Sequence, residues 1–129
     1  MPLRLLATLA ALNLLIGIAC GAFGAHALQA SLAPAMLAVW KTGVEYQLIH
    51  GLGLFAVAWL FSFSQARVFL VASLLMQIGI LLFSGSLYAL ALSSIGKLGM
   101  LTPFGGIAFL VAWALVAWGA WQRLQSDRQ

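Results

Sequence analysis

Charged residues are scarce in this sequence. Only 6% of its 129 residues are Asp, Glu, Lys or Arg, whereas about a quarter of the residues are charged in an ordinary soluble domain. Hydrophobic residues make up 64% of the chain, which excludes intrinsic disorder, because a disordered chain needs low hydrophobicity and high charge. The composition therefore predicts a single small integral membrane domain over residues 1–129.

Cysteines and acidic residues are also nearly absent. Cys20 is the single cysteine, so the chain cannot form an internal disulfide. The two acidic residues are Glu45 and Asp127, and Asp127 lies in the C-terminal tail, on the side opposite the polar motifs. A Ser-His-Asp catalytic set is therefore not expected, and we predict a protein that is not an enzyme and holds no metal. The basic residues occur singly, which argues against a nucleic-acid partner.

Long hydrophobic runs, in contrast, fill most of the chain. A membrane-spanning helix needs about 20 mainly apolar residues. Because the first such run is long enough to span and three more follow it, we interpret it as a retained span rather than a cleaved signal. The sequence predicts an all-α integral membrane protein, a bundle of four transmembrane helices. The predicted spans cover residues 3–23, 44–63, 67–90 and 102–121.

The segment between the first two spans is expected to lie at the membrane surface. It is too polar to span the bilayer and too apolar for a free loop. Pro34 suits the first turn of a helix, and Trp40 is a residue type that favours headgroup depth. We predict a short interfacial helix over residues 34–41. It is either a separate cap over the bundle or continuous with the second span through a bend at Gly43.

The distribution of basic residues predicts the orientation. With four spans, both termini and the middle turn lie on one side of the membrane. An excess of Lys and Arg marks the cytoplasmic side, so we predict a multi-pass protein of the bacterial inner membrane with both termini in the cytoplasm. The termini side holds Arg4, Arg67, Arg123 and Arg128, and the other side holds Lys41 and Lys97.

Polar residues that interrupt the apolar spans form the candidate site. Each is costly in hydrocarbon and needs a packing or functional reason, and their positions along the spans place them near the outer surface. Glu45 either pairs with Lys41 one turn earlier or reaches His26 or Lys97, and a carboxylate beside a histidine is a candidate proton-transfer unit. The predicted cluster comprises His26, Glu45, Tyr46, Gln47, His50, Ser84, Tyr88 and Thr102.

A second set of small and amide residues predicts helix packing. Gly17 and Gly21 form a small-xxx-small pattern, which lets a neighbouring helix approach closely. Asn13 and Gln77 both lie near mid-depth. Because an unpaired amide is costly there, we expect these two side chains to face the bundle interior and to hydrogen-bond each other. The predicted packing residues are Asn13, Gly17, Gly21, Gly24 and Gln77.

The start of the fourth span admits two interpretations. Thr102 can cap the helix with Pro103 at its first position, and the glycines at 105 and 106 then permit close packing. Alternatively, the exposed N–H groups of the helix start bind an anionic headgroup or substrate.

Four sequence blocks resemble a known family. They are Gly-Ala-Phe-Gly-Ala-His-Ala-Leu (21–28), Lys-Thr-Gly-Val-Glu-Tyr-Gln-Leu-Ile-His (41–50), Phe-Ser-Gly-Ser-Leu-Tyr (83–88) and Leu-Thr-Pro-Phe-Gly-Gly (101–106). The chain is similar, over nearly its whole length, to the YgdD/YwdK-like family of small membrane proteins, catalogued as domain of unknown function four-two-three. The resemblance implies a four-span membrane protein and carries no established reaction.

The residues leave several functions open. A glycine-rich helix face and little soluble mass favour a non-enzymatic module in the lipid bilayer, acting as an oligomer or as an accessory subunit of another membrane protein. The polar cluster alternatively binds a lipid, a quinone or another small molecule. Glu45 and the two histidines alternatively form a proton or transport path, although no span is expected to be broken at mid-depth. No cofactor is expected; the remaining alternative is haem held by His26 and His50.

Overall fold

The computed structural model describes the backbone of residues 3–126 and the side chains of residues 3–123, so Asp127 and Arg128 lie outside the described residues. The described chain is helical and contains no strand. Its elements are α1 (Leu3–His26), the 3₁₀ turn η1 (Leu28–Ala30), α2 (Pro34–Ser64), α3 (Arg67–Gly79), the π-helical segment η2 (Ile80–Ser84), α4 (Gly85–Ser93), the 3₁₀ turn η3 (Gly96–Met100) and α5 (Thr102–Ser126).

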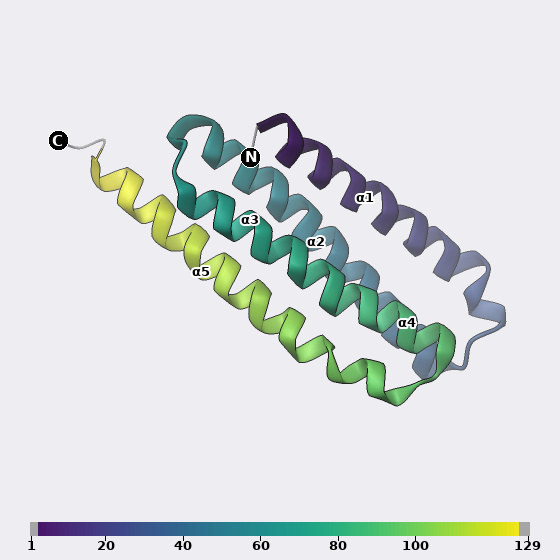
Figure 1. Ribbon diagram of the computed structural model, residues 1–129. Coiled ribbons are helices and arrows are strands. Elements are labelled where there is room, and N and C mark those ends of the chain that lie inside the picture. The colour runs from purple at the N-terminus through teal and green to yellow at the C-terminus, as the bar shows by residue number, and fades with distance from the viewer. Residues whose placement is uncertain (1–2, 127–129) are drawn as a thin grey trace.

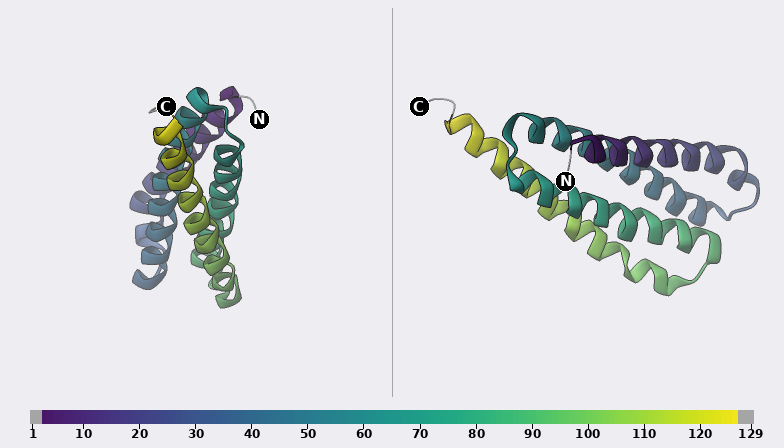
Figure 2. Two further views of the ribbon diagram at one scale, coloured as in Figure 1. Left: turned by 90° about the vertical axis from the view of Figure 1, so that its left-hand side faces the viewer. Right: turned by 45° about the horizontal axis from the view of Figure 1, so that its top comes forward.

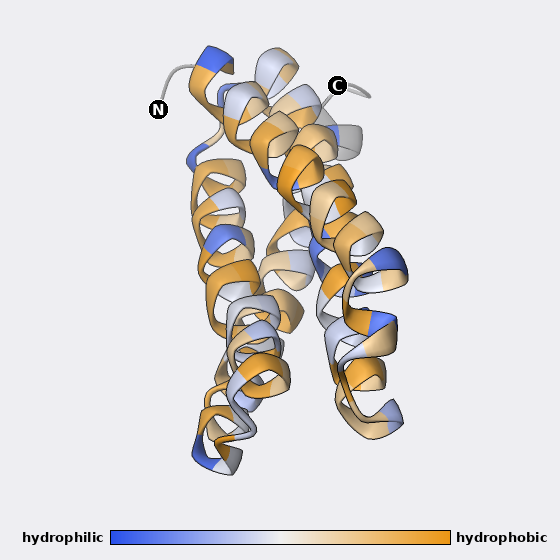
Figure 3. Ribbon diagram, turned by 90° about the vertical axis from the view of Figure 1, so that its right-hand side faces the viewer, coloured by the Kyte–Doolittle hydropathy of each residue, from blue (hydrophilic) through white to orange (hydrophobic). Residues whose placement is uncertain are grey.

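Four helical stretches are long and apolar enough to cross a membrane, which confirms the predicted four-span, all-α architecture. They are Leu3–Ala30, Pro34–Ser64, Arg67–Ser93 and Gly96–Arg123. The third consists of α3, η2 and α4 in one continuous rod, which we call the third span. Hydrophobic residues dominate the length of every span (Figure 3).

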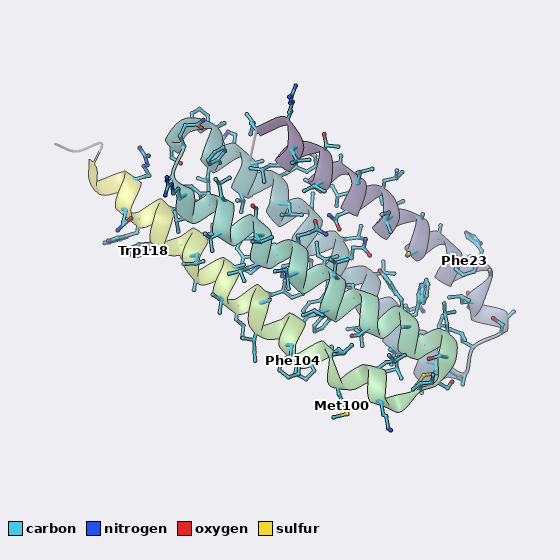
Figure 4. All side chains as sticks on the ribbon, in the orientation of Figure 1. Phe23, Met100, Phe104 and Trp118 are labelled. Carbon is cyan, nitrogen blue, oxygen red and sulfur yellow. The ribbon has the colours of Figure 1, made fainter. Side chains whose placement is uncertain are left out.

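The α2 helix and the third span form the centre of the molecule, and α1 and α5 lie on opposite flanks (Figures 1 and 2). Packing is mainly between chain neighbours, with α1 against α2 and α5 against α3. Many large apolar side chains of the flanks therefore remain exposed, as a lipid-facing surface requires. Figure 4 shows Phe23, Met100, Phe104 and Trp118 pointing away from the bundle.

Both termini and the α2–α3 turn lie at one end of the bundle, while η1 and η3 lie at the other (Figure 1). The α2–α3 turn reverses the chain at Gln65, whose backbone is left-handed and whose N–H donates to the Phe61 carbonyl. The Arg123 guanidinium donates to the Ser64 carbonyl, which ties the end of α5 to this turn.

Of the two alternatives for residues 34–41, the structure has the helix that continues into the second span. Residues 34–41 are the first two turns of α2, which continues without a break through Gly43 to Ser64. Trp40 packs inside the bundle, because it is only 4% exposed and its indole N–H donates to the Cys20 carbonyl at 2.9 Å. Gly24 makes room for this ring, since a Cβ there would lie 2.7 Å from it. Anchoring Trp40 on α1 keeps the start of α2 within the bundle.

The third span contains a π-helical segment that the sequence did not predict. At its end, the Gly85 N–H bonds to the carbonyl of Ile80, five residues back, and π-helical segments often occur at functional sites. The α5 helix comes close to the backbone of this segment: a Cβ at Gly105 would lie 2.5 Å from the Phe83 backbone nitrogen. The segment thus joins the third span to α5.

Two adjacent glycines of α5 provide a matched test of this contact. A methyl group at Gly105 would meet backbone, whereas a Cβ at Gly106 has no neighbour closer than 3.9 Å. We expect Gly105→Ala to lower the free energy of unfolding by about 1–3 kcal/mol, the range for overpacking. Gly106→Ala should not lower it and should raise it by up to about 1 kcal/mol, because alanine favours the helix more than glycine does. SDS titration of both variants, followed by circular dichroism, measures the difference, and equal stabilities would contradict the close approach.

Candidate functional site

The structure divides the predicted polar cluster into separate parts. His26 and Glu45 are exposed. Within the described residues, neither forms an ion pair or a hydrogen bond, so Glu45 is paired with neither Lys41 nor Lys97 and does not reach a histidine. The carboxylate–histidine unit considered from the sequence is therefore not assembled, and the described bundle holds no relay that runs from Glu45 through His26 and His50.

Asn13 on α1 connects to the third span. Its Nδ2 donates to the Leu9 carbonyl at 2.8 Å and to Oε1 of Gln77, also at 2.8 Å. A backbone carbonyl can only accept, so the bond to Leu9 fixes which atom of the Asn13 amide is nitrogen. That in turn fixes the Gln77 atom as oxygen. The hydrogen bond expected between these two amides is present, and it joins α1 to α3.

Gln47 extends the same network to α2 and α4. Its Nε2 donates to the Asn13 carbonyl at 3.1 Å, and its Oε1 accepts from the Tyr88 hydroxyl at 2.8 Å. The Asn13 carbonyl orients the Gln47 amide in the way that the Leu9 carbonyl orients Asn13. Gln47 is only 3% exposed. A connected set of neutral polar groups thus links α1, α2, α3 and α4, and we call it the amide network.

The amide network has unused bonding capacity. Within the described residues, neither the Nε2 of Gln77 nor the Oδ1 of Asn13 has a hydrogen-bond partner. Both residues line a lateral groove of about 330 Å³ between α1 and the third span, which we call the amide groove. Its lining residues are Leu9, Leu12, Asn13, Ile16, Gln47, Gln77, Ile80, Leu81, Gly85 and Tyr88.

His50 and Tyr46 face a different element, α5. The His50 ring lies against Phe109 with ring centroids 3.4 Å apart, and Tyr46 stacks on Phe83 at 4.2 Å. The His50 Nδ1 lies 2.7 Å from the Tyr46 carbonyl and must donate to it, so Nε2 carries the lone pair of the neutral ring. We call the lateral groove here, about 410 Å³ in volume, the aromatic groove. Its lining residues are Tyr46, His50, Phe83, Pro103, Gly106, Ile107, Phe109, Leu110 and Trp113.

The last two residues of the predicted cluster, Thr102 and Ser84, belong to neither the amide network nor the aromatic groove. The Thr102 hydroxyl lies 2.8 Å from the hydroxyl of Ser86, so it joins α5 to α4 rather than capping its own helix. Ser84 is fully buried within η2, and among the described residues its hydroxyl has no partner. The sequence analysis did not select Ser86, which is also buried and pairs with Thr102.

The predicted packing glycines lie at close helix contacts. Gly17 and Gly21 of α1 face α2, where a Cβ would lie 2.8 Å from Leu48 and 3.3 Å from Val44, respectively.

The haem alternative needs two histidines that face one another. The structure does not bring them together, because His26 is exposed at the end of α1 whereas His50 contacts α5 on the opposite flank. The described residues also contain no group of three or more His, Cys, Asp or Glu side chains that could hold a metal ion.

The two tyrosines of the chain provide a matched test of the amide network. Tyr88→Phe leaves the buried Oε1 of Gln47 without its donor, and we expect the free energy of unfolding to fall by about 1 kcal/mol. The Tyr46 hydroxyl has no hydrogen-bond partner among the described residues, so Tyr46→Phe should change stability by less than about 0.5 kcal/mol. SDS unfolding of the two variants compares them directly. A larger effect at Tyr46 would refute the assignment.

Comparison with known proteins places the chain in a family. It is 46% identical to the UPF0382 membrane protein YwdK of Bacillus subtilis over 109 residues, 84% of this chain and 89% of the relative. It is 38% identical to the UPF0382 inner membrane protein YgdD of Escherichia coli over 120 residues, 93% of this chain and 92% of the relative. No solved structure matches the chain. A family model matches residues 20–106, and the chain belongs to that family of membrane proteins, described as Protein of unknown function (DUF423).

Proposed function

We propose that this protein is a non-enzymatic accessory module that binds a helix of another membrane-embedded protein in the amide groove. The observation that carries the proposal is the unused bonding capacity of the amide network. Gln77 offers two N–H donors and Asn13 offers an acceptor, and both line a groove on the side of the bundle. These groups require a partner.

The membrane interior makes that requirement strong. Lipid chains cannot accept or donate hydrogen bonds, and a polar group left unpaired in an apolar medium costs several kcal/mol. A hydroxyl or amide side chain on a neighbouring helix can accept from Gln77 and donate to Asn13 at the same time. Such interhelical bonds are a general source of association between transmembrane helices.

The apolar rim of the groove suits the same partner. Leu12 and Leu81 are exposed on its two sides, so a helix lying across the groove would bury apolar surface around one polar contact. The groove accommodates side chains rather than a whole helix, so side chains of the partner helix can enter it by knobs-into-holes packing.

The chemistry of the network supports a non-enzymatic role. Three of its four side chains are neutral amides, which bind and orient but do not serve as general acids or bases. The fourth, Tyr88, already donates its proton to Gln47 in a hydrogen bond. The network is suited to holding helices in register.

Two exposed leucines of the third span test the docking site. Leu81 lines the amide groove, and Leu92 lies outside it; the two are 64% and 57% exposed. We expect Leu81→Trp to fill the groove and abolish association, whereas Leu92→Trp should leave it intact. The tagged protein is extracted from native membranes in a gentle detergent, and the mass of the complex is measured.

The wild type and the Leu92 variant should run well above the 13.7 kDa of one chain. Mass spectrometry of the complex identifies its members and shows whether the partner is another protein or a second copy. A wild type that runs as a lone chain, or a Leu81→Trp variant that retains its partner, would refute the proposed site.

We also propose that both termini lie in the cytoplasm. The end of the bundle that holds the termini carries Arg4, Arg67 and Arg123 among the described residues, whereas the opposite end carries Lys41 and Lys97. Positively charged residues near span ends favour the cytoplasmic side. The relative YgdD is named an inner membrane protein, which is consistent with this setting.

Reporter fusions test this orientation. Green fluorescent protein fused after residue 129 should fluoresce, because it folds in the cytoplasm, and alkaline phosphatase at the same position should be inactive. The control fusion is placed in the η3 connection, where the two reporters should give the opposite result. Active phosphatase at the C-terminus would reverse the assignment.

A further inference from the structure

We infer that the aromatic groove binds the ring of a lipid-soluble quinol, with the quinol hydroxyl donating to Nε2 of His50. This site is distinct from the amide groove, since it lies between α2 and α5. The inference concerns binding alone and is independent of the proposed association with another membrane protein.

His50 is the first reason to expect a ligand. The side chain is only 5% exposed and lines the groove, and its Nδ1 is occupied by the Tyr46 carbonyl. Among the described residues, Nε2 has no hydrogen-bond partner. An acceptor without a donor is costly in an apolar setting. A ligand that supplies a hydroxyl or another N–H or O–H group would satisfy it.

The ring geometry is the second reason. The planes of Tyr46, His50 and Phe109 lie within 29° of one another, and Tyr46 is inclined 26° to Phe83. These rings stack on one another, and a further flat ring packed against the outside of the stack would add an offset contact of the same kind. An acyl chain would gain no such contact, so the stack favours a conjugated planar ligand over a lipid tail.

The opening of the groove is the third reason. Leu110 and Ile107 on its rim are 74% and 58% exposed, and the rim lies on the lipid-facing surface of α5. A ligand with a long apolar tail can therefore place its ring in the groove and leave its tail in the bilayer. Pockets of this kind, mostly apolar with a few polar groups, are typical of small-molecule sites.

Tyr46 adds a second polar contact to the same groove. Its hydroxyl has no partner among the described residues, and it can donate to a ring oxygen while His50 accepts from a ring hydroxyl. A quinol carries oxygens at opposite positions of one ring, so it can engage both residues. This combination of one acceptor, one donor and flat stacking surfaces identifies the ligand class.

Decylubiquinol, a quinol with a short tail, is the probe. Its binding to the full chain in nanodiscs is measured by quenching of tryptophan fluorescence, because Trp113 lines the groove. We expect saturable binding that weakens about tenfold in His50→Phe, the fold-change expected for one buried hydrogen bond. His26→Phe is the matched control, since His26 is exposed at the end of α1, and should bind as the wild type does.

A second variant and a second ligand decide the outcome if His50→Phe does not fold. Gly106 lines the groove, and a Cβ there would make only ordinary van der Waals contact with the Phe83 ring, 3.9 Å away, so Gly106→Leu should block the groove and abolish binding. The dimethyl ether of the same quinol keeps the ring but cannot donate, and it should bind about tenfold more weakly to the wild type. Absence of saturable binding, insensitivity to Gly106→Leu, or equal affinities for quinol and ether would overturn the inference.

Discussion

Two backbone carbonyls of α1 determine how the polar interior is built. The Leu9 carbonyl accepts from the side-chain amide of Asn13, and the Asn13 carbonyl accepts from the side-chain amide of Gln47. These two bonds fix the orientation of both amides. As a result, the Oε1 of Gln47 accepts from the Tyr88 hydroxyl. The Asn13 and Gln77 groups that have no hydrogen-bond partner belong to residues that line the amide groove. In a membrane, water cannot replace a lost hydrogen-bond partner. This arrangement therefore fixes the helix contacts, and it leaves the groups without a partner at the amide groove, where we propose that another helix binds.

The π-helical segment gives the other half of the molecule a different character. It brings the backbone at Phe83 against Gly105 of α5, and the Phe83 ring stacks on Tyr46 and lies tilted against Phe109. The chain therefore has two faces of different chemistry. One, between α1 and the third span, presents amides, and the other, between α2 and α5, presents aromatic rings and a histidine.

The sequence was sufficient for the architecture and for part of the site. Hydrophobic run lengths located the four spans, and the cost of a buried amide paired Asn13 with Gln77 correctly. The sequence was insufficient where the position of a residue depends on its neighbours in three dimensions. Nothing local marks Trp40 as a residue buried against α1, because its position depends on the space above Gly24. The π-helical segment has no simple sequence signature.

The central claim is that the amide groove is occupied by a helix of another membrane protein. A photo-cross-linking amino acid placed at position 81, and at position 92 as the control, reports what lies beside each site in native membranes. Our account predicts a discrete protein adduct from position 81 and none from position 92. Adducts with lipid alone at position 81 would contradict it.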